Sequence, residues 1–341
     1  MNRRNWLWLA SGGVFGGCVP MGGVWTRSWG GATVERADAI ARASGGRGWA
    51  AWESGSLRKS WRTHYRGPVL SVTKAMAGLA CARAVGEGWL DLDEPAAETL
   101  TEWSGDPLKS RITTRHLLQM TAGLDDGAGR LYRRGIADKG RVALALPLVD
   151  PVGARFRYGP ACWEVLAELL HRKASARGGS LEGFLSRAVM RPLGLSSPEW
   201  RADAKGRFFL STGAELNVTE MGRLGRAIGR LAGGSAVGGI PASAFRDVTR
   251  PSSVNPMFGG GVWSNQRGSR GWSIEVEEEL DPPKDASFWR AACLSRGQPS
   301  TMLALIGSAG QRVFIWPDEG RVIARLGFSG SWRDAPLLQV V

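Results

Sequence analysis

The sequence predicts an α+β fold: one antiparallel sheet built from both ends of the chain, flanked by helices, with a mainly helical lobe inserted between the ends. Strand-length apolar segments occur at residues 48–62 and again at residues 259–328, and the stretch between them reads as helices joined by Gly/Pro loops. Strands grouped at the chain ends, instead of alternating with helices, favour α+β over a βαβ pattern. A length of 341 residues exceeds what one core usually organises. We therefore expect a sheet lobe from residues 31–82 and 257–341 and a helical lobe from residues 83–256.

The N-terminal part of this pattern reads as a helix followed by a hairpin. The segment ATVERADAIARA (32–43) is amphipathic, and GWAAWESGSLRKSWR (48–62) reads as two short strands around the turn ESGS. Gly67 and Pro68 then mark an irregular approach to a run rich in Ala and Leu, which predicts a buried helix. Ser71 therefore lies at a helix start.

The middle of the chain carries helix signals, and its last part carries strand signals. Cap-like threonines open ITTRHLLQMTAGL (112–124), helical spacing runs through ACWEVLAELLHRKA (161–174), and NVTEMGRLGRAIGRLAGG (217–234) has a cap-like start and two terminal glycines. Apolar residues then cluster or alternate in the strand-length pieces GGGVWSN, WSIEVEE, TMLALIGSAG and QRVFIWPDEGRVIARLGF, with PDEG as a hairpin turn. Both signals agree with the α+β arrangement.

The charge balance argues against one class of partner. The chain has 44 Lys+Arg against 31 Asp+Glu, a formal net charge of +13. Such an excess can attract nucleic acid or an anionic membrane surface. Here the arginines are scattered, without a basic run or a nucleic-acid motif. We therefore expect no nucleic-acid partner. Separately, we expect the protein to be a monomer.

Residues 1–30 are predicted to be an export signal or an N-terminal anchor. They combine a positive start, a modestly apolar Gly-rich middle and small residues near a plausible cleavage point. The pair Arg3 and Arg4 resembles a twin-arginine signal, and FGGC, ending at Cys18, resembles a degenerate lipoprotein cleavage site. These features predict an exported protein, either periplasmic or attached to the membrane through its N-terminus.

Cysteine and histidine usage indicates neither a disulfide framework nor a metal site. Outside the leader, the cysteines stand alone among apolar neighbours: Cys81, Cys162 and Cys293. The histidines lie far apart and form no HExxH-like pair: His64, His116 and His171. We therefore expect buried free thiols, and chemistry that needs no cofactor and no metal ion.

The residues with the clearest chemical potential are Ser71 and Lys74, in SVTK. On a helix, residues three apart share a face, so the hydroxyl and the amine can meet. A lysine can take the serine proton only if burial or neighbouring positive charge lowers its pKa. The helix start adds free backbone N–H groups and the positive end of the dipole. Taken alone, such a pattern is more often an N-cap followed by a solvated lysine, so the surrounding sequence must decide.

Several further segments follow SVTK in a characteristic order. LSVTKAMAGLACARAVGEGWLDLDEPAAETLTEW and ITTRHLLQMTAGL come first, followed by RFRYGPACWEVLAELLHRK, RPLGLSSPEW, LSTGAELNVTEMGRLGRAI, GGGVW and GSAGQRVFIWPDEGRVIARLG. Together they resemble the serine beta-lactamase-like superfamily, which includes class C beta-lactamases, D-alanyl-D-alanine peptidases, family VIII esterases and aminohexanoate-oligomer hydrolases. The resemblance spans about residues 35–330. It implies a beta-lactamase/transpeptidase-like fold with the active site at the interface of the two lobes.

The resemblance also implies roles for individual residues. Ser71 matches the family's nucleophile, which forms an acyl-enzyme, and Lys74 matches the base that activates it. Tyr158, in RYGP, matches the tyrosine of the Y-x-N motif, which assists proton transfers. A phenol with a pKa near ~10 needs a cationic neighbour such as Lys74 to act at neutral pH. The oxyanion hole would consist of the backbone N–H groups of Ser71 and of Ser308, which follows the strand glycine Gly307.

Two departures from the family pattern bear on the substrate. Pro160 stands where the family often has the Asn of Y-x-N, so another group must hold Lys74 or the site is looser. The K-T-G strand motif is best matched by LIG, Leu305 to Gly307, which lacks the lysine and the threonine that bind a substrate carboxylate. Aliphatic groups leave a buried carboxylate unpaired, which favours a neutral ester or amide.

The sequence therefore predicts an exported serine hydrolase that cleaves a small ester or amide through an acyl-enzyme on Ser71. Two alternatives stay open: a beta-lactamase or D,D-peptidase, and a catalytically decayed binding protein on the same scaffold. The missing Asn and Lys and the short C-terminal segment favour the decayed protein, and the joint presence of Ser71, Lys74 and Tyr158 opposes it. Trp263, in GGGVWSN, and Gly307 are predicted to contact the small-molecule substrate.

Overall fold

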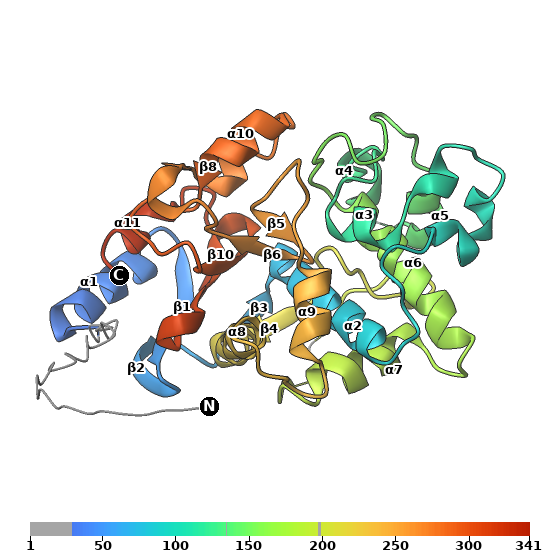
Figure 1. Cartoon of the computed structure of the whole chain (residues 1–341). Coiled ribbons are helices and arrows are strands. Elements are labelled where there is room, and N and C mark those ends of the chain that lie inside the picture. Colours follow the sequence, from blue (N-terminus) through green and yellow to red (C-terminus); the bar gives the residue numbers. More distant parts are fainter. Residues whose placement is uncertain (1–28, 134, 197–198) are drawn as a thin grey trace, which may run out of the picture.

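The computed structural model describes residues 29–133, 135–196 and 199–341 and confirms the α+β fold (Figure 1). Its main sheet has seven strands in the order β2-β1-β11-β10-β9-β6-β5, and all neighbours are antiparallel. The strands are β1 (Gly46–Glu53), β2 (Ser56–Trp61), β5 (Phe258–Gly259), β6 (Val262–Ser264), β9 (Leu303–Gly307), β10 (Gln311–Trp316) and β11 (Arg321–Gly327). The predicted hairpin is confirmed as β1 and β2, and the two ends of the chain meet where β1 pairs with β11.

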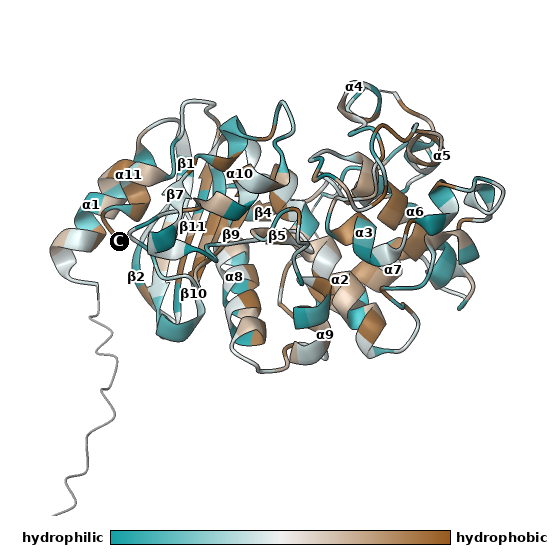
Figure 2. Ribbon diagram, turned by 45° about the horizontal axis from the view of Figure 1, so that its top comes forward, coloured by the Kyte–Doolittle hydropathy of each residue, from teal (hydrophilic) through white to brown (hydrophobic). Residues whose placement is uncertain are grey.

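Both faces of the sheet are covered, which explains why β10 and β11 are buried along their whole length. On β1, Trp49 and Trp52 point to opposite faces because side chains alternate along a strand. Trp49 donates through Nε1 to Asp38 of α1 (Gly31–Arg42) at 2.6 Å. Trp52 packs beside Gly222 of α8 (Val218–Ala232) on the other face. Figure 2 shows hydrophobic residues concentrated on these central strands and on the inner helices.

Seven of the helices form a second lobe beside the sheet (Figure 1). They are α2 (Thr73–Gly86), α3 (Thr114–Leu118), α4 (Ala128–Leu131), α5 (Lys139–Leu144), α6 (Ala161–Ser175), α7 (Leu181–Leu185) and α9 (Ala242–Val248). The predicted caps are present: Thr113 and Asn217 each accept from the backbone N–H three residues later. Although α8 falls within the range 83–256 predicted as the helical lobe, it packs on the sheet, so it belongs to the sheet lobe.

One predicted strand is mostly absent. Of WSIEVEE, only Trp272–Ser273 forms a strand, β7, which pairs in parallel with β8 (Ala292–Cys293), and a 3₁₀ turn follows at Val276–Glu278. Two short helices complete the chain, α10 (Ala286–Ala291) and α11 (Ala335–Leu338). Residues 1–28 of the predicted export signal, with Cys18, lie outside the described residues. Within the described part of the chain, every helix is too short or too polar to span a bilayer.

Candidate active site

Ser71 lies on a tight turn that leads directly into α2. Leu70–Val72 forms one 3₁₀ turn, and α2 begins at the next residue, Thr73. The residue before the serine, Leu70, has φ +49°, a left-handed conformation that costs a bulky residue about 1–2 kcal/mol. Surrounding structure must therefore hold this turn in place. Ser71 is buried, with 7% of the residue exposed.

Lys74 is brought together with Ser71, as the spacing predicts. Its Nζ donates to Ser71 Oγ at 2.8 Å and to the backbone carbonyl of Ser211 at 2.9 Å. The lysine is 1% exposed. Burial lowers its pKa to about 7, and the charge of the nearby Glu164 carboxylate acts in the opposite direction. A lysine with this pKa is partly neutral at physiological pH and can accept a proton from a hydroxyl.

Tyr158 lies beside the amine of Lys74. Lys74 Nζ is 4.9 Å from the centroid of the Tyr158 ring. Burial raises the pKa of the Tyr158 phenol well above its usual value, and a hydrogen bond with Ser71 opposes this shift. The phenol therefore stays protonated at neutral pH. Its nearness to Ser71 and Lys74 unites the three predicted side chains in one site.

Trp263 packs against the ring of Tyr158. Its ring centroid is 6.1 Å from that of Tyr158 and 4.8 Å from that of Phe258, within an aromatic cluster that includes Phe156 and Trp289. At 1% exposure it is a packing residue that supports the phenol. Its predicted contact with substrate stays a prediction.

The end of strand β9 approaches the nucleophile turn. A Cβ added at Gly307 would lie 2.5 Å from the carbonyl oxygen of Val69 and 3.3 Å from the backbone nitrogen of Ser71. Only glycine fits at this position without a shift of backbone. The strand end and the N–H of Ser71 are therefore neighbours, as an oxyanion hole requires.

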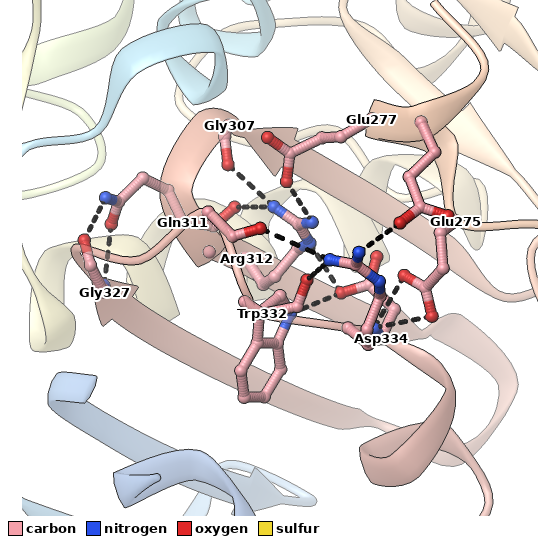
Figure 3. Close-up of polar contacts among 12 residues, drawn as sticks. Glu275, Glu277, Gly307, Gln311, Arg312, Gly327, Trp332 and Asp334 are labelled. Carbon is pink, nitrogen blue, oxygen red and sulfur yellow. Dashed lines mark hydrogen bonds and ion pairs between the residues drawn. The ribbon is translucent and has the colours of Figure 1, made fainter. Parts of the chain in front are cut away.

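Behind that strand end, Arg312 of β10 holds the carbonyl of Gly307 (Figure 3). Arg312 Nη1 donates to this oxygen at 2.7 Å, while its Nε and Nη2 bind Asp334 and Glu277 at 2.7 and 2.5 Å. In a trans peptide the C=O and the N–H point in opposite directions. The N–H of Ser308 therefore points away from Arg312, and Ser308 itself is exposed.

The two departures from the family pattern have structural counterparts. Leu305 and Ile306 are 0% and 5% exposed, so the positions of the missing K-T-G polar groups are filled by packed aliphatic side chains. Pro160 directly precedes α6 and has no amide to offer. The Ser211 carbonyl accepts from Lys74 instead, and it thereby supplies the second partner that the missing Asn leaves open.

Two residues of this site were missed by the sequence analysis: Ser211 and Glu164. Glu164 is 1% exposed on α6, and its Oε1 accepts from Ser211 Oγ at 2.5 Å and from Ser211 N at 3.2 Å. A signal was present for Glu164 alone, a carboxylate within the stretch ACWEVLA, whereas Ser211 meets Lys74 through a backbone carbonyl that any residue type could supply. A carboxylate in an otherwise apolar helical segment is a sign of a buried polar contact.

Other predicted features concern metals and thiols. Cys81, Cys162 and Cys293 are buried and free, as expected. Among the described residues, no group of three or more His, Cys, Asp or Glu side chains has a geometry that could hold a metal ion. The site built from Ser71, Lys74 and Tyr158 brings together a hydroxyl, an amine and a phenol.

One family model and two curated relatives match this sequence. The family model described as Beta-lactamase matches residues 21–327. Acyltransferase calJ of Penicillium decumbens is 31% identical over 157 residues, 38% of this chain and 36% of that protein. Esterase EstB of Burkholderia gladioli is 33% identical over 144 residues, 37% of this chain and 36% of that protein. The match thus spans about a third of the length of each curated relative.

The fold is shared with solved structures over nearly the whole chain. A family VIII carboxylesterase has a TM-score of 0.65 at 15% identity, with 90% of this chain and 95% of that chain covered. The likeness confirms the predicted beta-lactamase/transpeptidase-like fold. Since the family model matches most of the sequence, the chain belongs to the beta-lactamase family.

Proposed function

We propose that this protein is a serine hydrolase that cleaves a small, neutral ester or amide through an acyl-enzyme on Ser71. One observation carries the proposal: the amine of Lys74, with a pKa lowered to about 7 by burial, lies 2.8 Å from Ser71 Oγ. An amine of this kind can serve as a general base, which contributes roughly 10²–10⁴-fold to such reactions.

In the proposed reaction, neutral Lys74 accepts the proton of Ser71 as Oγ attacks the substrate carbonyl carbon. The N–H groups of Ser71 and Ser308 stabilise the negative oxygen of the tetrahedral intermediate. Tyr158, protonated because burial raises its pKa, donates a proton to the leaving alcohol or amine, and is reprotonated from Lys74. In the second step, Lys74 accepts a proton from water as the water attacks the acyl group. Ser71 Oγ then leaves with a proton from Tyr158, and the acid is released.

The charges around the strand end support a neutral substrate. Leu305 and Ile306 cannot pair a carboxylate, and the guanidinium of Arg312 is already bound to Asp334 and Glu277. The matched relatives named an esterase and an acyltransferase fit the same preference. A beta-lactam or a peptidoglycan stem carries a carboxylate that this strand would leave unpaired.

A fluorophosphonate probe tests the proposal. It should label the purified full-length protein at Ser71, and the Ser71→Ala variant should remain unlabelled while keeping its thermal unfolding temperature. Hydrolysis of p-nitrophenyl butyrate should be lost with the same substitution and exceed nitrocefin turnover in the parent protein. A folded protein that takes up no probe would rule out the hydrolase and favour a non-catalytic binding protein. Faster nitrocefin turnover would favour a beta-lactamase.

A further inference from the structure

A buried carboxylate outside the predicted trio interacts with the amine of Lys74 through its charge. Glu164 is on the first turns of α6, is 1% exposed, and directs its Oε1 at both the hydroxyl and the backbone N–H of Ser211. The desolvation of an ionised carboxylate is costly, and such a group stays in a fold only where hydrogen bonds or opposite charges stabilise it. Both kinds of stabilisation are present here.

The hydrogen bonds lead from Glu164 to the predicted base. Ser211 binds Glu164 through its N–H and Oγ, and its carbonyl accepts from Lys74 Nζ at 2.9 Å. The same segment is attached to the nucleophile turn, since Ala214 N donates to Thr73 Oγ1 at 3.1 Å and Val69 N donates to the Ala214 carbonyl at 3.0 Å. With Ser211 held at two atoms, its carbonyl has little freedom to rotate away from the amine.

The opposite charges come from two neighbouring elements. Lys74 of α2 and Lys139 of α5, which is 4% exposed, are both attracted to the Glu164 carboxylate. The phenol of Tyr132, which follows α4, also lies within reach of its charge. Burial raises the pKa of Glu164, whereas the Ser211 hydrogen bonds and the charges of Lys139 and Lys74 favour its ionised form. The carboxylate thus interacts with two buried amines, one of which is the predicted base.

We propose that Glu164 is a positioning residue, which acts through Ser211 to hold the Lys74 amine against Ser71 and places a negative charge behind that amine. The inference rests on the proposed function, because it concerns the base of that same reaction. In this proposal, the carboxylate of Glu164 and the backbone carbonyl of Ser211 hold Lys74. The family's Asn would do so in other members, and Pro160, which stands in its place, cannot.

The two parts of this role are separable by substitution. Glu164→Gln keeps the oxygen that accepts from Ser211 and removes the charge. Without that charge Lys74 loses its proton more easily, so the acid limb of the kcat/KM profile should move down by about one pH unit. Glu164→Ala also removes the acceptor, and kcat should fall about tenfold to a hundredfold, with KM nearly unchanged.

The matched control is Glu168→Gln, one helical turn further along α6. Glu168 is 6% exposed and binds Arg172 and Arg207, without a contact to Ser211. This variant should keep the parent midpoint of the pH profile even if its stability falls. A change that reflects only the loss of a buried charge on α6 would appear in both variants.

The measurement is the rate of Ser71 labelling by the fluorophosphonate, and of p-nitrophenyl butyrate hydrolysis, from pH 5 to 9. A parent protein that takes up no probe contradicts the proposed function. A labelled parent whose acid limb coincides with that of Glu164→Gln overturns the role of Glu164 alone. If Glu164→Ala does not fold, Glu164→Gln, which is nearly the same size, carries the test by itself.

Discussion

Burial is the property that distinguishes Lys74 from an ordinary helical lysine. A solvated lysine in the first turn of a helix keeps a pKa near ~10 and is charged at neutral pH. Lys74 is 1% exposed, and burial lowers its pKa to about 7, while Ser71 and the Ser211 carbonyl accept its hydrogen bonds. The SVTK motif therefore accounts for the position of the amine but not for its lowered pKa. The pKa depends on the surrounding protein, which excludes water from the amine.

The rate of Ser71 labelling should rise with pH through a midpoint near 7. The direction follows from the proposed role, since only the neutral amine can accept the serine proton, and Lys74 becomes neutral as the pH passes its pKa of about 7. Lys74→Ala should lower the rate by roughly 10²–10⁴-fold at pH 8. The check is a pH series of probe uptake with mass spectrometry of the labelled peptide.

A midpoint above pH 9 would mean that the lysine behaves as a solvated one. In that case Lys74 would not be the base that activates Ser71. Lys59→Ala serves as the control, because Lys59 lies on β2 and pairs with the exposed Glu35 of α1. Its labelling rate should equal that of the parent protein.

The contact between β9 and the turn before α2 places the strand end beside the nucleophile. β9 belongs to the sheet, and α2 lies among the helices beside it, so this contact joins the sheet to those helices. Gly307 permits the approach because it has no side chain. Arg312 fixes the direction of the peptide that follows, through the carbonyl of Gly307 (Figure 3).

Gly307→Ala should lower kcat/KM by about a hundredfold, because the new methyl group would collide with the carbonyl of Val69 and push the strand away from Ser71. The loss of one oxyanion donor costs roughly 10²–10³-fold in acyl-transfer enzymes. Gly105→Ala is the control, since a Cβ there meets no atom within 4 Å. Ester hydrolysis by the two purified variants gives the comparison, and equal activities would refute the predicted contact.

The assembly of the sheet depends on residues from both ends of the chain. β1 and β11 pair along Gly46–Glu53 and Arg321–Gly327. Because the helical segments lie between these two strands in the sequence, the sheet can close only after those segments have been synthesised. Arg312 adds a second link, since its guanidinium joins the strand end to Glu277 and to Asp334 near the C-terminus (Figure 3). It is 1% exposed, and Asp334 is 4% exposed.

Arg312→Ala should lower the free energy of unfolding by about 3–5 kcal/mol, because it leaves a buried carboxylate without its partner. Arg333→Ala is the matched control: Arg333 pairs with Glu278 at the surface, and both side chains are nearly half exposed. A surface pair of this kind contributes at most about 1 kcal/mol. Chemical denaturation of both variants measures the difference. Equal losses would show that the buried cluster contributes no more than a surface pair.

Much of this protein follows from local sequence. Periodicity determines α1 and α6, periodicity together with a cap determines α8, and alternating or continuous apolar runs determine the hairpin and β9 to β11. The spacing of SVTK places Ser71 and Lys74 on one helical face. Such features depend on neighbours a few residues apart, and for that reason a pattern in the sequence can predict them.

The tertiary structure decided the features that join distant segments. α8 packs on the sheet although it falls within the range 83–256 that was predicted as the helical lobe, because Gly222 and Gly225 let Trp52 and Val313 approach. Ser211 meets Lys74 through a backbone carbonyl 137 residues away, and a carbonyl carries no mark of residue type. The lowered pKa of Lys74 likewise arises from burial by several segments. These contacts exist only when the chain is folded, since they depend on distance in space and not on order along the sequence.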